Sequence, residues 1–211
     1  MAARRVLVLL VALAGCGSSQ AATTPRHVSD APGPCAPAGD TLIAADGTAE
    51  IYQSNRTVYG CAGRGGHGYR LGVTQTCINA DRVGPVTLSG AVAAYGVQRC
   101  GVDTGTAQVV VRRLTDGKVL HASPAVSRVP GAESYATVAT VVVKRDGSTA
   151  WIGGAHSIVR RGSSVTEVRR FDTHGQTLLD HGAGIAVGSL RLHGSRLSWT
   201  HAHSSRSANL S

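Results

Sequence analysis

Aromatic residues are scarce in this sequence: among 211 residues there are one phenylalanine, two tryptophans and five tyrosines. Proteins that bind single-stranded nucleic acids stack the bases on several aromatic side chains. Sugar-binding sites likewise use exposed aromatic rings. The composition therefore argues against nucleic acid as a partner and gives little support to a sugar site.

Local patterns of catalytic residues are also missing. No G-x-S-x-G turn presents a nucleophilic serine, and no local grouping of serine, histidine and an acid indicates a triad. Glutamate occurs only at Glu50, Glu133 and Glu167, which gives poor support to a carboxylate pair for glycoside hydrolysis. We therefore expect no catalytic residues and no cofactor, although side chains distant in sequence can still meet in the fold.

A hydrophobic run long enough to span a membrane is absent, because residues 6–14 fall far short of the ~20 residues that a spanning helix needs. Two arginines precede this run, and it ends in the motif L-A-G-C, whose cysteine is Cys16. The segment resembles the lipobox of bacterial lipoprotein signal peptides. The resemblance implies cleavage before Cys16, acyl chains such as palmitate at that residue, and localisation at the outer face of the cell membrane. An ordinary secretory signal with a chance cysteine is the alternative.

The chain is expected to have three parts. Residues 1–15 form the signal peptide. Residues 16–37 contain the lipidated cysteine and a flexible tether, because they are rich in Gly, Ser, Ala, Thr and Pro and have few large apolar groups. Residues 38–211 are long enough for one sizeable core.

The other four cysteines are Cys35, Cys61, Cys77 and Cys100. An even number in an exported protein favours two disulfides. Three pairings are open, and similar loop lengths around one hairpin unit each favour Cys35 with Cys61 and Cys77 with Cys100. Zinc is the rival interpretation, but no C-x-x-C pair is present.

The chain is strongly basic, with a formal net charge of +9 of which the signal peptide carries two. Outside the cell, a basic surface attracts lipid head groups and anionic wall polymers. The Arg-Arg doublets at 112–113, 160–161 and 169–170 are predicted to be solvated strand faces and ends rather than a binding groove.

The sequence pattern of residues 38–211 predicts an all-β domain, because it has short valine-rich runs, abundant glycine and Asp-Gly turn signals. Three segments repeat a glycine turn followed by a strand ending in an aromatic residue, and a fourth has asparagine instead of glycine. The aromatic residues of these segments are Tyr59, Tyr95, Trp151 and Trp199. After two of them, a V-R-R element begins at Val111 and Val168. Each unit is thus predicted to be an inner hairpin followed by an outer hairpin.

Residues 109–120 and 192–199 carry the V-x-V-x-x-L-x-x-G and L-x-G-x-x-L-x-W elements. Here the chain resembles secreted, often lipid-anchored, β-propeller-like proteins of actinobacteria. The resemblance implies a small or incomplete β-propeller-like domain of about four units, the last one strand short. A closed ring would need residues 41–52 to complete that last unit, and otherwise the units form an open arc or a β-sandwich.

His201 and His203 are the candidate metal ligands, because residues at i and i+2 share one side of a strand. The alternative is that both histidines simply face solvent, since no third ligand can be named.

The expected function is a lipid-anchored extracytoplasmic binding module without catalytic activity, with the membrane and a protein or an anionic wall component as partners. The alternative is an exported hydrolase or metal-dependent enzyme with its site at the centre of the blades.

Overall fold

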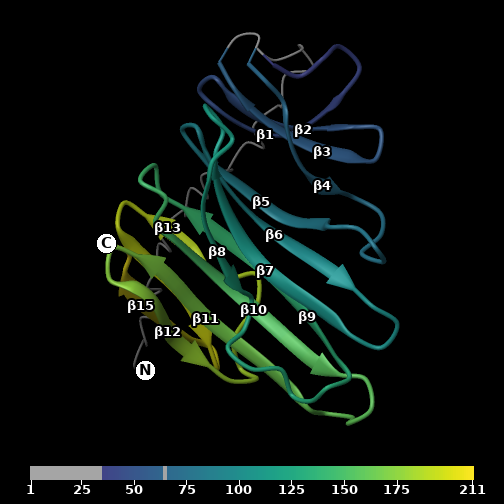
Figure 1. Cartoon of the computed structure of the whole chain (residues 1–211). Helices are drawn as coiled ribbons and strands as arrows, with labels where there is room; N and C mark the ends of the chain where they lie inside the picture. The colour runs from purple at the N-terminus through teal and green to yellow at the C-terminus, as the bar shows by residue number, and fades with distance from the viewer. Residues whose placement is uncertain (1–34, 64–65) are drawn as a thin grey trace, which may run out of the picture.

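A computed structural model describes residues 35–63 and 66–211, which contain strands and no helix (Figure 1). Because no helix occurs in these residues, none there is suited to crossing a bilayer. The strands are β1 (Thr41–Asp46), β2 (Ala49–Ser54), β3 (Thr57–Ala62), β4 (Tyr69–Val73), β5 (Arg82–Ser89), β6 (Val92–Cys100), β7 (Gly105–Arg113), β8 (Val119–Pro124), β9 (Ser134–Val143), β10 (Thr149–Ser157), β11 (Ser164–Asp172), β12 (Gly175–His181), β13 (Arg191–His193), β14 (Arg196–His201) and β15 (Ser204–Asn209). The all-β prediction is confirmed. The signal peptide, Cys16 and most of the expected tether lie outside the described residues.

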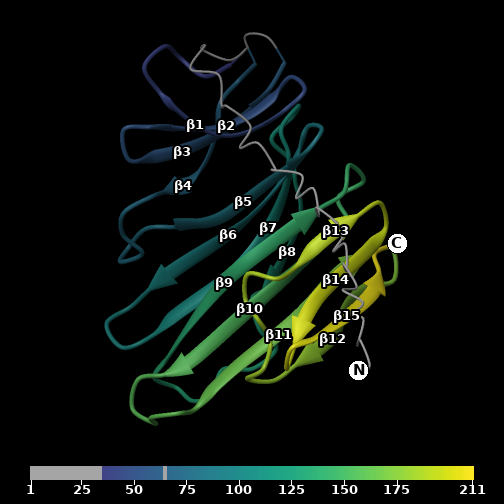
Figure 2. The same ribbon diagram turned by 180° about the vertical axis from the view of Figure 1, so that it is seen from behind.

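The strands form four consecutive antiparallel units: β1–β4, β5–β8, β9–β12 and β13–β15. Single parallel bridges, Val73 with Arg82 and Gly105 with Tyr135, join the first three units into a twelve-stranded sheet. The fourth unit is a separate three-stranded sheet, which lies over β11 and β12 (Figure 2). The first strands of successive units contact one another, β1 with β5, β5 with β9 and β9 with β13.

The described residues do not form a closed ring. β1 and β2 pair with each other within the first unit and do not add a strand to β13–β15. Figure 1 shows the first unit at one end of the molecule and the fourth near the other. The two ends of the chain of units therefore stay apart.

The repeated aromatic residue sits on the second strand of a unit, as Tyr95 in β6, Trp151 in β10 and Trp199 in β14. The prediction for Tyr59 is wrong, because Tyr59 lies on β3, the third strand of its unit. Its counterpart is Tyr52 in β2, preceded by the Asp46-Gly47 turn. The glycine of this repeat closes the turn with a positive φ, +94° at Gly147 and +59° at Gly194, where a side chain is disfavoured.

Each buried aromatic faces the preceding unit, so apolar layers separate successive units. Tyr95 packs with Ile51 and Leu71 of the first unit. Trp151 packs with valines of β6 and β7, and Trp199 packs with Ile152 of the third unit. At about 25 cal/mol per Å² of apolar surface buried, these layers are the main favourable term that holds the units together.

The aromatic residues of the first unit have no preceding unit to pack against, and a disulfide covers them instead. Cys35 bonds to Cys61, and this pair packs on Tyr52 and Tyr59. The backbone amides of Cys35 and Ala36 donate hydrogen bonds to the buried carboxylate of Glu50 at 3.3 and 3.1 Å. The second disulfide joins Cys77 to Cys100, so the favoured pairing is confirmed.

Candidate functional site

The structure separates the two histidines proposed as metal ligands. β14 ends at His201, whereas His203 lies in the following turn with φ +64°, so the two do not share one side of a strand. His201 Nδ1 lies 2.9 Å from Oδ2 of Asp180. Neither histidine belongs to a group of three metal-ligating side chains within the described residues.

One group with ligand-like geometry does occur, formed by Cys35, Glu50 and Cys61. Both of its sulfur atoms are consumed by the disulfide, and Glu50 accepts backbone hydrogen bonds. A cysteine binds a metal only through its free thiolate, so this group is structural.

Three other polar clusters each fix one part of the fold. Asp180 accepts hydrogen bonds from Trp199 and from the backbone of His181, and it pairs with His201. It thereby connects β12 to the fourth unit. Burial alone would raise the pKa of Asp180, but these partners and the nearby Arg206 hold it below its usual range.

In the second cluster, Glu167 binds the hydroxyl and backbone amide of Ser127 at 2.5 and 2.8 Å and Arg169 Nη1 at 2.6 Å. Burial acts to raise the pKa of Glu167, yet these contacts keep it below its ordinary value. The cluster therefore anchors the connection between β8 and β9 on β11.

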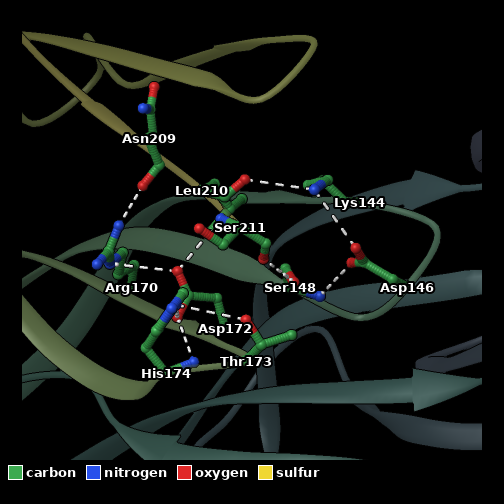
Figure 3. A network of polar contacts seen from close by, with 10 residues as sticks. All are labelled: Lys144, Asp146, Ser148, Arg170, Asp172, Thr173, His174, Asn209, Leu210 and Ser211. Atoms are coloured by element: carbon green, nitrogen blue, oxygen red, sulfur yellow. Dashed lines mark hydrogen bonds and ion pairs between the residues drawn. The ribbon is translucent and has the colours of Figure 1, made fainter.

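The third cluster, drawn in Figure 3, attaches residues 209–211 to the third unit. Ser211 donates its backbone N–H to Asp172 at 3.2 Å and accepts from the Ser148 hydroxyl at 2.6 Å. Lys144 Nζ donates to the carbonyl of the fully buried Leu210 at 3.3 Å. These contacts hold the fourth unit against the third.

The best candidate for a binding site is a groove between β4 and the face of β6, β7 and β8, which we call the β6–β8 groove. Its cavity measures about 500 Å³, within the usual range for ligand sites. A second cavity of about 340 Å³ shares Asp81, Val97, Arg99 and Gln108 with it and extends toward Pro124. Together the two hollows form an elongated site.

Strand register explains which side chains line this groove. Side chains alternate between the two faces of a sheet, so Tyr95, Val97 and Arg99 of β6 share one face. Opposite them on β7, Val110 faces Tyr95 and Gln108 faces Val97. The first unit covers only part of this face, which leaves the remainder as the floor of the groove.

Three arginines, Arg70, Arg99 and Arg112, line the groove, against one acid, Asp81. Asp81 is already paired with Arg99 at 2.6 Å. The Arg112 Nη1 donates to the carbonyl of Gly117 at 3.1 Å, whereas its Nε is buried and has no hydrogen-bond partner among the described residues.

Tyr95 forms part of the floor of the groove and is nearly fully buried. Burial raises the pKa of its phenol, while the charge of Arg112 acts in the opposite direction. The phenol is therefore neutral at physiological pH and contributes an apolar ring and a hydroxyl. With Val97 and Val110, it gives the groove an apolar base beneath a basic rim.

The arginine doublets correct the prediction from the sequence. Arg113, Arg160 and Arg161 are solvated or lie at strand ends, as expected, but Arg112 faces the groove and Arg169 is buried against Glu167. Alternation along a strand sends adjacent arginines to opposite faces. The sequence therefore shows that the two arginines of a doublet on a strand point to opposite faces, but it does not reveal which face another unit would cover.

The described residues that line the groove include no histidine, cysteine, serine or glutamate. Their ionisable side chains are Asp81, Tyr95 and the arginines Arg70, Arg99 and Arg112. Guanidinium groups match the geometry of carboxylate and phosphate oxygens. The groove has the chemistry of an anion-binding site.

No protein-family model, no curated protein and no solved structure matches the chain.

Proposed function

We propose that this protein is a lipid-anchored extracytoplasmic binding module that holds an anionic ligand in the β6–β8 groove. The observation that carries the proposal is the set of three arginines, Arg70, Arg99 and Arg112, that line the cavity. An extended anion, such as a segment of a wall polymer with phosphate or carboxylate groups, fits this shape and charge. The enzyme alternative gains no support from this site.

The four units are proposed to be blades of an open, propeller-like arc. Three four-stranded meanders and one three-stranded meander follow each other in order, and their first strands come together, as the inner strands of propeller blades do. In such an arc the faces of the blades remain accessible near its outer strands. The β6–β8 groove lies on one of these faces.

Binding is tested by titration calorimetry of the full chain with glycerol phosphate oligomers and, separately, with oligoglutamate. Arg112→Met keeps the length of the side chain and removes its charge. A hydrogen bond to a charged group is worth about 1.5–3 kcal/mol, so we expect affinity to fall about 10- to 100-fold. The matched control is Arg113→Met, since Arg113 is on the opposite face and pairs with Asp116 at 2.7 Å.

Equal affinities of the two variants would overturn the groove as the binding site, and no binding of either anion would overturn the anionic ligand. Anchoring is tested separately by metabolic labelling with a fatty acid. Cys16→Ser is expected to abolish labelling, and labelling that persists would contradict the lipid attachment at Cys16.

A further inference from the structure

The two ends of the strands differ sharply in chemistry. At the end where β5 meets β6 and β9 meets β10, the turns at residues 90–91 and 145–148 carry no exposed large apolar side chain. Four other connections lie at the opposite end, toward which the arrowheads of β6 and β10 point in Figure 1. These are residues 74–81, 101–104, 125–133 and 158–163.

Five large apolar side chains project from these connections, and we call them the aliphatic rim. They are Ile78, Val102, Val129, Ile158 and Val159, exposed by 63%, 93%, 49%, 47% and 63%. They account for five of the nine large apolar residues that are exposed in the described part of the chain. Single exposed apolar residues are ordinary, but their concentration on neighbouring loops indicates an interaction surface.

Hydrogen bonds hold the rim in place. The hydroxyl of Tyr135 donates to the carbonyl of Val102 at 3.1 Å, and Gly101 N–H donates to Thr104 within the same loop at 2.7 Å. The amide of Ile158 donates to the carbonyl of Glu133 at 3.0 Å. The bond between Ile158 and Glu133 joins residues 158–163 to residues 125–133, and the bond between Tyr135 and Val102 ties residues 101–104 to β9. The loops that carry these apolar side chains are therefore held at one end of the strands.

Exposed arginines lie directly beside these apolar side chains. Arg128 precedes Val129, and Arg160 and Arg161 follow Val159. The exposed acids on the same loops are Asp103 and Glu133, while Asp81 is paired with Arg99. The unpaired charges on the rim are therefore positive in balance, which favours an anionic surface.

We propose that the aliphatic rim contacts an anionic lipid bilayer. The aliphatic side chains enter the boundary between head groups and acyl chains, and the arginines bind lipid phosphates, the combination used by interfacial membrane-binding segments. Separate tips on several loops suit a deformable lipid surface, whereas a protein partner needs one continuous complementary face. The proposal does not rest on a ligand in the β6–β8 groove or on lipid attachment at Cys16.

Vesicle sedimentation of the full chain carrying Cys16→Ser tests the contact without an acyl anchor. Vesicles of phosphatidylglycerol and phosphatidylcholine are compared with vesicles of phosphatidylcholine alone. We expect binding to the anionic vesicles that weakens with salt and falls about 10-fold or more in Val102→Asn/Val159→Asn. Leu178→Asn is the matched control, because Leu178 is 44% exposed in the middle of β12, away from the rim.

Equal vesicle binding by the double variant and the Leu178→Asn control would overturn the proposal, as would equal binding to both kinds of vesicle. Absence of vesicle binding combined with self-association that the double variant abolishes would assign the rim to a second copy of the chain. That result would also overturn the lipid contact.

Discussion

Trp199 Nε1 donates a hydrogen bond of 2.7 Å to Oδ2 of Asp180, and both side chains are buried. Asp180 belongs to β12 and Trp199 to β14, so the bond joins the large sheet to the three-stranded sheet. Trp199 itself belongs to an apolar cluster with Ile152, Val168 and Leu197. A buried carboxylate here is stabilised because several donors converge on it.

Asp180→Ala is expected to lower the free energy of unfolding by about 2–3 kcal/mol, since it leaves the indole N–H of Trp199 without a partner. Urea denaturation followed by tryptophan fluorescence measures the change. Asp103→Ala is the control, because Asp103 is exposed in the loop between β6 and β7. A loss in Asp180→Ala no larger than that of the control would contradict a stabilising role for this bond.

Stability is expected to fall in acid, because the folded protein lowers the carboxyl pKa values of Glu167, Asp172 and Asp180. Burial acts to raise the pKa of each carboxyl, but hydrogen bonds and nearby cations bring each below its ordinary value. Their contribution is therefore present above the unfolded pKa of about 4 and lost as the pH falls through the lower folded pKa. Urea midpoints between pH 7 and pH 2 measure this loss, and Asp180→Asn should reduce its size. An unchanged profile in that variant would rule out a contribution of Asp180.

Gly153→Ala is expected to destabilise the protein by about 1–3 kcal/mol, the typical cost of overpacking. A Cβ at Gly153 would lie 2.0 Å from the carbonyl oxygen of Ala125, which also accepts the Trp151 indole hydrogen bond at 2.9 Å. A Cβ at the neighbouring Gly154 would make only ordinary van der Waals contacts, the nearest at 3.5 Å from the carbonyl oxygen of Val165. Gly154→Ala should leave stability unchanged or raise it by up to about 1 kcal/mol. Thermal melts of both variants distinguish the two positions, and equal melting temperatures would show that the β8–β9 connection does not lie against Gly153.

Each disulfide is expected to contribute about 3–4 kcal/mol on the loop-closure account, because the paired cysteines are 26 and 23 residues apart. Cys35→Ser/Cys61→Ser and Cys77→Ser/Cys100→Ser should therefore lose similar amounts of stability in urea denaturation. Peptide mapping without reduction should recover Cys35 with Cys61 and Cys77 with Cys100. Recovery of a pair that joins a cysteine of one disulfide to a cysteine of the other would disprove the pairing.

Much of the fold is predictable because it depends on local chemistry. Glycine turns and valine-rich runs predict strands, and the repeated aromatics predict similar units. In the first unit the pattern predicts the repeat one strand too late, at Tyr59 instead of Tyr52, because both tyrosines follow a turn. The tyrosine that packs like Tyr95 can be identified only from the strand order.

The candidate site is less predictable. Arg112 and Arg113 are adjacent and chemically identical, yet one lines the groove and the other is paired with Asp116 at the surface. Similarly, the histidine pair suggests a shared face, but the turn at Ala202 and His203 begins directly after His201. In both cases the sequence identifies the residues but not their surroundings.

The sequence by itself determined the all-β class and the presence of repeated units, and it favoured one of the three possible pairings of the four cysteines. These features follow from turn chemistry, alternation and loop length, which act over a few tens of residues. Tertiary structure alone decided which face of each sheet is covered, which arginines line a groove and which loops gather at one end. Those features arise from packing between units, and that packing depends on contacts between segments far apart in the chain.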